Sequence, residues 1–270
     1  MFPLYVINPT GRTAWITYAI IAANTALLLW SLTLGPGDYE KITAHYGFIP
    51  ARIAQLRDPR LVVQVPVGVA VVRVPPFGQL REVPQVANLS ADRAEIYSSL
   101  LTCMFLHAGW AHLLGNMWFL LIFGKNIEDR LGHIPYLIFY LVGGLAASAV
   151  HWASGPGSTA PVIGASGAIA AVLGAYAVTF PTARVVTVVF LLVYFTVIEL
   201  PALVVLGLWF IMQLFDGVSG LRIHLSGGVA FWAHVGGFDA GAAMMEFISQ
   251  LLPPISAEPE PAADTDTTPW

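Results

Sequence analysis

Charged residues are scarce in this chain. Asp, Glu, Lys and Arg together make up 10% of its 270 residues, whereas soluble domains average about 25%. Hydrophobic residues make up 57%, and the mean hydropathy is +0.72. A chain with so little polar surface cannot cover a water-facing exterior, so we expect it to be embedded in lipid. No basic patch stands out, and we expect no nucleic-acid partner.

Cysteine is also nearly absent. Cys103 is the only one, which excludes an internal disulfide and any metal site built on several cysteines. Residues 1–12 contain Arg12 and no small-residue cleavage pattern, which argues against a cleavable signal peptide. We therefore expect a retained first membrane span after a short N-terminal segment.

Long apolar runs fill most of the remaining chain. A helix needs about 20 residues to cross the hydrocarbon core of a bilayer. We predict an all-α membrane domain over residues 13–252, with six transmembrane helices. The predicted spans are residues 13–34, 104–123, 134–154, 162–180, about 198–215, and 229–252.

Three segments do not fit a helical span. The long first loop, 35–103, contains a Val- and Pro-rich stretch at 61–76, which predicts short strands or a hairpin. The β-branched stretch 185–198 predicts an interfacial or partly extended connection. The acidic tail, 253–270, should be disordered.

Basic residues in short loops predict the orientation, because Lys and Arg favour the cytoplasmic side. We expect both termini to be cytoplasmic and the plasma membrane of a bacterium to be the location. With six spans, the inner segments hold Arg12, Lys125, Arg130 and Arg184, and the short outer loops hold only Arg222.

The second, fourth and sixth predicted spans run in the same direction, and each begins with polar residues. Polar groups inside a bilayer are costly and are usually functional. We expect these groups to converge at similar depth on the outer side. They are His107, His112 and Asn116 on the second span, Ser166 on the fourth and His234 on the sixth.

Small residues continue along the helices from Ser166 and from His234. At about 100° per residue they form one stripe on each helix, and such stripes let transmembrane backbones approach closely. Facing stripes would bring Ser166 and His234 together. The stripes are Ser166, Ala170, Gly174 and Ala177, and Ala230, His234, Gly237 and Gly241.

This placement predicts acyl-transfer chemistry. A serine hydroxyl becomes a strong nucleophile when a base takes its proton, and His234 could be that base for Ser166. The backbone N–H of Ser166 and the side chains of His112 and Asn116 could stabilise the oxyanion.

Each residue alone has a simpler interpretation, as a packing serine, a buried histidine or an interhelical hydrogen bond. A shared metal ion is disfavoured, because His107 and His112 are about 140° apart around a helix and no glutamate lies between them. Asp239 projects from a different face than His234, so we do not expect it to complete a triad.

Four motifs resemble the signature series of rhomboid intramembrane proteases. They are HAGWAHLLGN at 107–116, GKNIEDRLG at 124–132, GASG at 164–167 and AHVGG at 233–237, within a similar region of about 100–245. The resemblance implies a six-helix bundle with a Ser166–His234 dyad, an oxyanion hole that includes His112 and Asn116, and no cofactor. Substrates would be membrane proteins, usually single-pass. The motif positions with structural roles would be Gly124, Glu128, Gly132, Gly164, Gly167, Gly237 and Gly241.

The chain departs from the family pattern at three places. Ser98 and Ser99 stand where many members have Trp-Arg, and Ala170 stands where many have an aromatic ring packed on the catalytic histidine. Asp239 replaces an apolar residue. A catalytically inactive relative that binds membrane clients is therefore the alternative hypothesis, whereas a transporter would predict an internal repeat that the sequence lacks.

Overall fold

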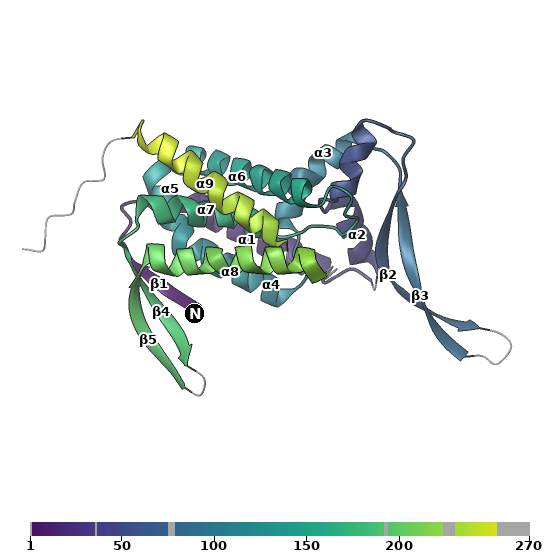
Figure 1. The fold of residues 1–270 in the computed structure, drawn as a ribbon, viewed down its shortest axis with the longest axis horizontal. Helices are drawn as coiled ribbons and strands as arrows, with labels where there is room; N and C mark the ends of the chain where they lie inside the picture. The colour runs from purple at the N-terminus through teal and green to yellow at the C-terminus, as the bar shows by residue number, and fades with distance from the viewer. Residues whose placement is uncertain (1, 36, 75–78, 192–193, 224–229, 253–270) are drawn as a thin grey trace, which may run out of the picture.

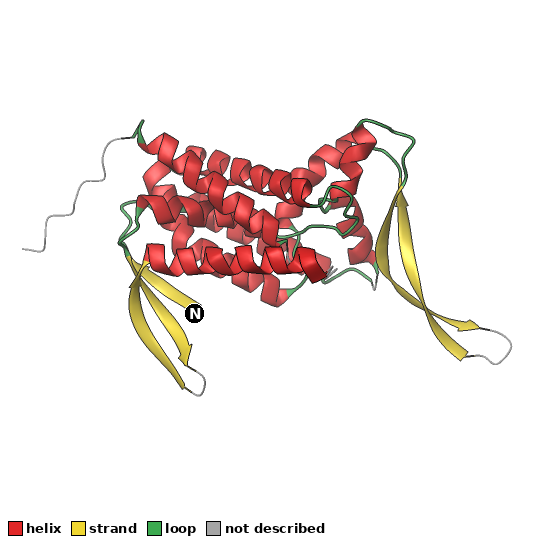
Figure 2. Cartoon of the chain, viewed as in Figure 1, coloured by secondary structure: helices red, strands yellow, loops and turns green. Residues whose placement is uncertain are grey.

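The computed structural model describes residues 2–35, 37–74, 79–191, 194–223 and 230–252. The predicted disordered tail, 253–270, lies outside the described residues. Apolar helices lie side by side in one body, and strands project from both of its ends (Figures 1 and 2).

The helices are α1 (Trp15–Ser31), α2 (Asp38–Tyr46), α3 (Arg93–Thr102), α4 (Trp110–Phe119), α5 (Lys125–Leu131), α6 (His133–Ser154), α7 (Ser166–Thr179), α8 (Ala202–Ile223) and α9 (Phe231–Ser249). Short helical segments are η1 (Pro50–Leu56), η2 (Cys103–Phe105) and the π-helical η3 (Leu120–Gly124).

The lengths of these helices identify some membrane spans directly. Among the described residues, α6 and the first 18 residues of α8 are each long and apolar enough to cross a bilayer. A third span is reached if Arg93–Phe105 and Trp110–Leu131, which meet at a 79° bend, are counted together. The apolar helices α1 and α7 are shorter, at 17 and 14 residues.

The predicted start of the second span is wrong. Residues after Phe105 leave the helical conformation, and α4 begins only at Trp110. Gly109 lies just before it with φ +156°, a conformation that side chains disfavour. His107 therefore lies in the loop that precedes the helix and not on it.

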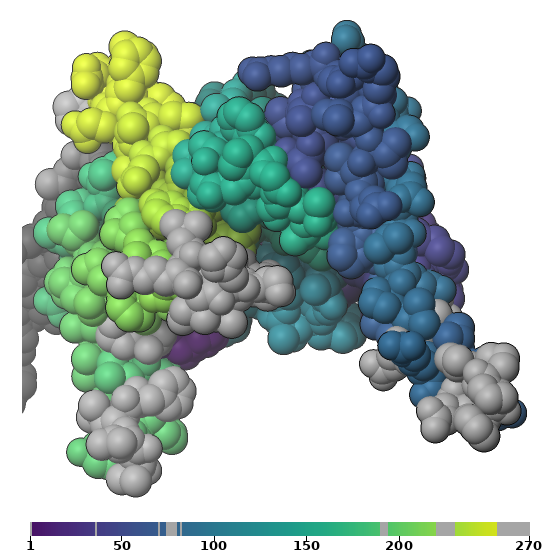
Figure 3. All heavy atoms as spheres, turned by 45° about the vertical axis from the view of Figure 1, so that its right-hand side comes forward, coloured from purple at the N-terminus to yellow at the C-terminus, as the bar shows by residue number. Residues whose placement is uncertain are grey.

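The chain is mostly helical but not all-α as predicted, since the described residues contain two antiparallel hairpins and a further strand. The hairpins stand clear of the helical body in the space-filling view (Figure 3). Short strands or a hairpin were predicted at 61–76, and strand structure is confirmed there, but as one 12-residue strand whose partner lies beyond the predicted stretch. The extended backbone predicted at 185–198 is confirmed in the described residues of that stretch. The strands are β1 (Phe2–Ile7), β2 (Val63–Val74), β3 (Gln79–Leu89), β4 (Arg184–Leu191) and β5 (Tyr194–Pro201).

The sequence analysis missed strand β1. It pairs antiparallel with β4, from Phe2 opposite Val188 to Ile7 opposite Arg184, and so makes a three-stranded sheet with β5. The described residues of 185–198 therefore belong to the paired strands of a hairpin. The helix of the predicted fifth span is α8, which starts at Ala202, directly after this hairpin.

Glu128 anchors the start of α1. Its carboxylate is 1% exposed and accepts hydrogen bonds from the backbone N–H groups of Ile16 and Thr17, both at 2.8 Å, and from the Thr17 hydroxyl at 2.7 Å. His133 Nδ1 lies 2.6 Å from the same carboxylate. The carboxylate thus satisfies N–H groups that a helix start leaves unpaired, at the positive end of the helix dipole.

Helices α7 and α9 approach so closely that only glycine fits at several contacts. A Cβ at Gly241 would lie 2.0 Å from the Ala171 carbonyl oxygen, and a Cβ at Gly237 would lie 2.2 Å from that of Gly167. At Gly174 it would lie 2.0 Å from the Phe238 oxygen. The two predicted small-residue stripes therefore do face each other.

Replacing Gly241 with alanine should separate these helices. We expect Gly241→Ala to lower the free energy of unfolding by about 1–3 kcal/mol, because backbone atoms of Ala171 cannot move aside cheaply. Gly115→Ala on α4 is a matched control, since nothing lies within 4 Å of its Cβ position. Denaturation in mixed micelles measures both variants, and equal stability of the two would contradict this packing.

Candidate active site

Ser166 and His234 meet at the N-terminal ends of α7 and α9. Ser166 is the first residue of α7, and His234 lies in the first turn of α9. The His234 Nε2 atom is 2.8 Å from the Ser166 Oγ atom, within hydrogen-bond distance. His234 is 9% exposed and Ser166 is half-buried. The predicted contact between these two side chains is therefore present.

Gln213 on α8 holds the other side of the imidazole. Its Oε1 atom lies 2.6 Å from His234 Nδ1. An amide oxygen only accepts hydrogen bonds, so Nδ1 carries the proton and Nε2 is left free to accept the Ser166 hydroxyl proton. The sequence analysis missed Gln213, although a glutamine within an apolar span is itself a signal.

Aromatic rings support the histidine from α8 and α9. The Trp209 ring lies 5.9 Å from the His234 ring, centroid to centroid, and the Phe231 ring lies at 6.5 Å, edge to face. Ala170 is fully buried at the α7–α9 contact, 3.2 Å from the Cβ position of Gly237. A large ring at Ala170 would not fit here, and Trp209 packs on the histidine from another helix.

His112 and Asn116 converge on the segment just before Ser166. Gly164 has φ +121°, and a Cβ there would lie 2.6 Å from His112 Nε2 and 3.6 Å from Asn116 Nδ2. Glycine is required at this position both for its backbone conformation and for the space. Both predicted oxyanion donors therefore lie against the backbone that leads into α7.

The protonation of His112 follows from its partner. The Ala108 backbone N–H lies 3.4 Å from His112 Nδ1. A backbone N–H can only donate, so Nδ1 is the acceptor, and in the neutral ring the proton is on Nε2. The donor atom of His112 is thus the one that faces Gly164.

His107 orients the second donor. Its Nε2 atom is 3.0 Å from Asn116 Nδ2, and its backbone oxygen accepts a 2.6 Å hydrogen bond from Tyr39 on α2. An amide nitrogen has two hydrogens, so Asn116 keeps one free. Asp239 is exposed and takes no part in these contacts.

A small cavity lies beside the serine, with a volume of about 20 Å³. Gly164, Ser166 and Ala233 are among its lining residues, with Ser148 on the α6 side. A space of this size holds one water molecule.

The fold and site define a class, a helical membrane protein with a buried serine–histidine pair at the ends of two closely packed helices. The model of the Rhomboid domain matches residues 94–251, and the chain belongs to the rhomboid family. RHOMBOID-like protein 1 of Arabidopsis thaliana is 24% identical over 88% of this chain and 54% of its own length. The mitochondrial RHOMBOID-like protein 6 of the same plant is 28% identical over 62% of the chain and 52% of its own length.

Shorter matches are more similar. The chloroplastic Rhomboid-like protein 11 of Arabidopsis thaliana is 42% identical over 26% of the chain and 24% of its own length. The chain thus spans about half or less of the length of these relatives. Family membership makes the chain a membrane protein. Two of these relatives are named as chloroplastic and mitochondrial proteins, and the names give no support to the predicted bacterial plasma membrane.

Proposed function

We propose that this protein hydrolyses peptide bonds of membrane proteins within or next to their transmembrane segments. The observation that carries the proposal is the 2.8 Å contact between Ser166 Oγ and His234 Nε2, with His234 Nδ1 held by Gln213. This arrangement lets the histidine act as a general base for a serine nucleophile.

The reaction would proceed in two steps. Ser166 Oγ attacks the carbonyl carbon while its proton moves to His234 Nε2, and the C–N bond breaks as His234 returns that proton to the leaving amine. A water then loses a proton to His234 and attacks the ester on Ser166, which releases the new carboxyl end and restores the hydroxyl. The small cavity beside Ser166 offers a place for that water.

The oxyanion formed in each step needs donors that are already in place. The Ser166 backbone N–H lies at a helix start, where it is free of intrahelical bonding. His112 Nε2 and the remaining Asn116 hydrogen lie against Gly164, two residues away. We propose that these three groups form the oxyanion hole, and that no cofactor is needed.

The proposal includes six membrane crossings, made by α1, α4–α5, α6, α7, α8 and α9. Both termini would be cytoplasmic, as the Lys and Arg distribution favours. Single cysteines introduced at Arg12 and at Arg222 in a Cys103→Ala background should then be labelled from opposite sides of the membrane. Labelling from one side would contradict this topology.

Cleavage of a transmembrane reporter tests the function. The purified full chain in liposomes should cut a single-pass reporter that has a readily unwound segment, and a fluorophosphonate probe should label Ser166. A folded protein that neither cleaves reporters nor reacts with the probe would be an inactive rhomboid-like protein, and would contradict the proposal.

A further inference from the structure

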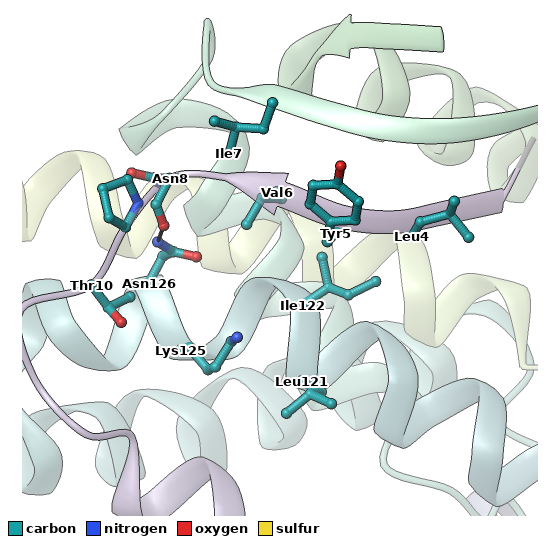
Figure 4. Close-up of a pocket in the computed structure, with 11 residues that line it drawn as sticks. Leu4, Tyr5, Val6, Ile7, Asn8, Thr10, Leu121, Ile122, Lys125 and Asn126 are labelled. Atoms are coloured by element: carbon teal, nitrogen blue, oxygen red, sulfur yellow. Dashed lines mark hydrogen bonds between the residues drawn. The ribbon is translucent and has the colours of Figure 1, made fainter. Parts of the chain in front are cut away.

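A groove between β1 and the η3–α5 segment lies outside the Ser166 site. Its volume is about 570 Å³, within the range of small-molecule sites. One wall is β1 with the residues after it, and the other is η3 with the start of α5 (Figure 4). It is lined by Leu4, Tyr5, Val6, Ile7, Asn8, Pro9, Thr10, Leu121, Ile122, Lys125 and Asn126.

The two walls are held together at both ends. Trp118 Nε1 donates a 2.8 Å hydrogen bond to the Pro3 oxygen, and its ring stacks on Phe2. At the other end Asn126 Nδ2 donates a 2.8 Å bond to the Asn8 oxygen. The groove is therefore a fixed part of the fold and not a gap between loosely placed segments.

The lining changes character along the groove. Polar residues gather at one end, where Lys125 and Asn126 face Thr10 and Asn8, and apolar side chains such as Leu121 and Leu4 line the other (Figure 4). In the proposed topology Lys125 lies at the cytoplasmic interface. The polar end of the groove would then sit at headgroup depth, and the apolar end would extend toward the acyl chains.

Two polar groups at the headgroup end lack partners among the described residues. Asn126 is 3% exposed, and its Oδ1 atom accepts no hydrogen bond. Lys125 is half-buried and makes no ion pair with the described residues, and the Asp129 carboxylate, one turn along the helix, accepts a hydrogen bond from the Gly11 N–H. A ligand that fits must bring a hydrogen-bond donor to Asn126 and a negative charge to Lys125.

We propose that this groove binds an anionic phospholipid whose headgroup carries a hydroxyl donor. The phosphate would pair with Lys125, the headgroup hydroxyl would donate to Asn126 Oδ1, and an acyl chain would lie along Leu121 and Tyr5. Leu121 and Tyr5 are 37% and 55% exposed, so the apolar end opens toward the bilayer. A choline headgroup lacks the donor and brings a cation close to Lys125.

Native mass spectrometry of the full chain in detergent tests the site directly. With phosphatidylglycerol and phosphatidylcholine added in turn, the wild type should retain phosphatidylglycerol in preference. Lys125→Gln should lower phosphatidylglycerol retention about fivefold, as expected for one surface cation, and leave phosphatidylcholine unchanged. Leu121→Trp should fill the apolar end and reduce retention of both lipids.

Arg184→Gln is the matched control, because Arg184 is also on the inner side but is paired with Glu199 at 3.0 Å. It should retain lipid as the wild type does. Equal phosphatidylglycerol retention by wild type and Lys125→Gln, or by wild type and Leu121→Trp, would overturn the proposal. So would displacement by equimolar inorganic phosphate, which would make the groove an anion site without a lipid. None of these readouts depends on proteolysis.

Discussion

Ser166→Ala is expected to abolish cleavage of a transmembrane reporter, with a loss of about 10⁴-fold or more in rate. Without the Oγ atom no acyl-enzyme forms, and the remaining donors and binding contacts give only a small residual rate. The variant should unfold at nearly the wild-type temperature, because alanine fits the space of serine at the start of α7. Turnover in liposomes and thermal unfolding in detergent measure the two effects separately.

Ser99→Ala is the matched control for this variant. Ser99 is 4% exposed, but it lies on α3, where its hydroxyl donates to the Ile96 oxygen, and it does not line the small cavity beside Ser166. We expect Ser99→Ala to keep most of the cleavage activity and all of the fluorophosphonate labelling. Full activity of the Ser166→Ala variant would contradict the assignment of Ser166 as the nucleophile.

Gln213→Met should reduce kcat about 10²-fold and leave KM nearly unchanged. Methionine keeps the size of the side chain but removes the acceptor for His234 Nδ1–H, so the imidazole loses the group that fixes its tautomer and orientation. The loss is smaller than at Ser166, because the base itself remains. Steady-state kinetics on the reporter distinguish the effect on kcat from an effect on substrate binding.

The Gln213→Glu variant distinguishes a role in orienting the His234 ring from a role in packing alone. A carboxylate also accepts from Nδ1–H, so this variant should recover to within about tenfold of the wild-type rate. Gln250→Met, at the exposed end of α9, should behave as wild type. If Gln213→Met kept full kcat, or if the glutamate variant were no better than methionine, Gln213 would have only a packing role.

The parts of the site that depend on the spacing of residues along one helix were predicted from the sequence. Helical periodicity placed Ser166 and His234 at the heads of facing small-residue stripes, and the 2.0 Å between a Cβ at Gly241 and the Ala171 oxygen shows why that position requires glycine. The polar starts of three parallel spans also predicted that His112 and Asn116 would gather near the serine.

What the sequence did not predict depends on contacts between distant segments. Gln213 is 21 residues from His234, on a helix whose start was uncertain until the β4–β5 hairpin fixed it at Ala202. Strand β1 was missed because six residues carry little signal, and its partner strand lies more than 170 residues away. His107 was predicted on a helix because the spacing of apolar residues gives no sign that the backbone at Gly109 is not helical. The helix begins only after that glycine.

The pairing of β1 with β4 also has a topological consequence. Hydrogen-bonded strands must lie on the same side of a bilayer, so the chain from Ile7 to Arg184 must cross it an even number of times. The same parity applies between Phe48 and Val162, which form an isolated bridge. In the proposed topology four crossings lie between Ile7 and Arg184, made by α1, α4–α5, α6 and α7. Two of them, α4–α5 and α6, lie between Phe48 and Val162. If α1, α4–α5, α6 or α7 alone failed to insert, β1 and β4 would lie on opposite sides of the bilayer and could not pair.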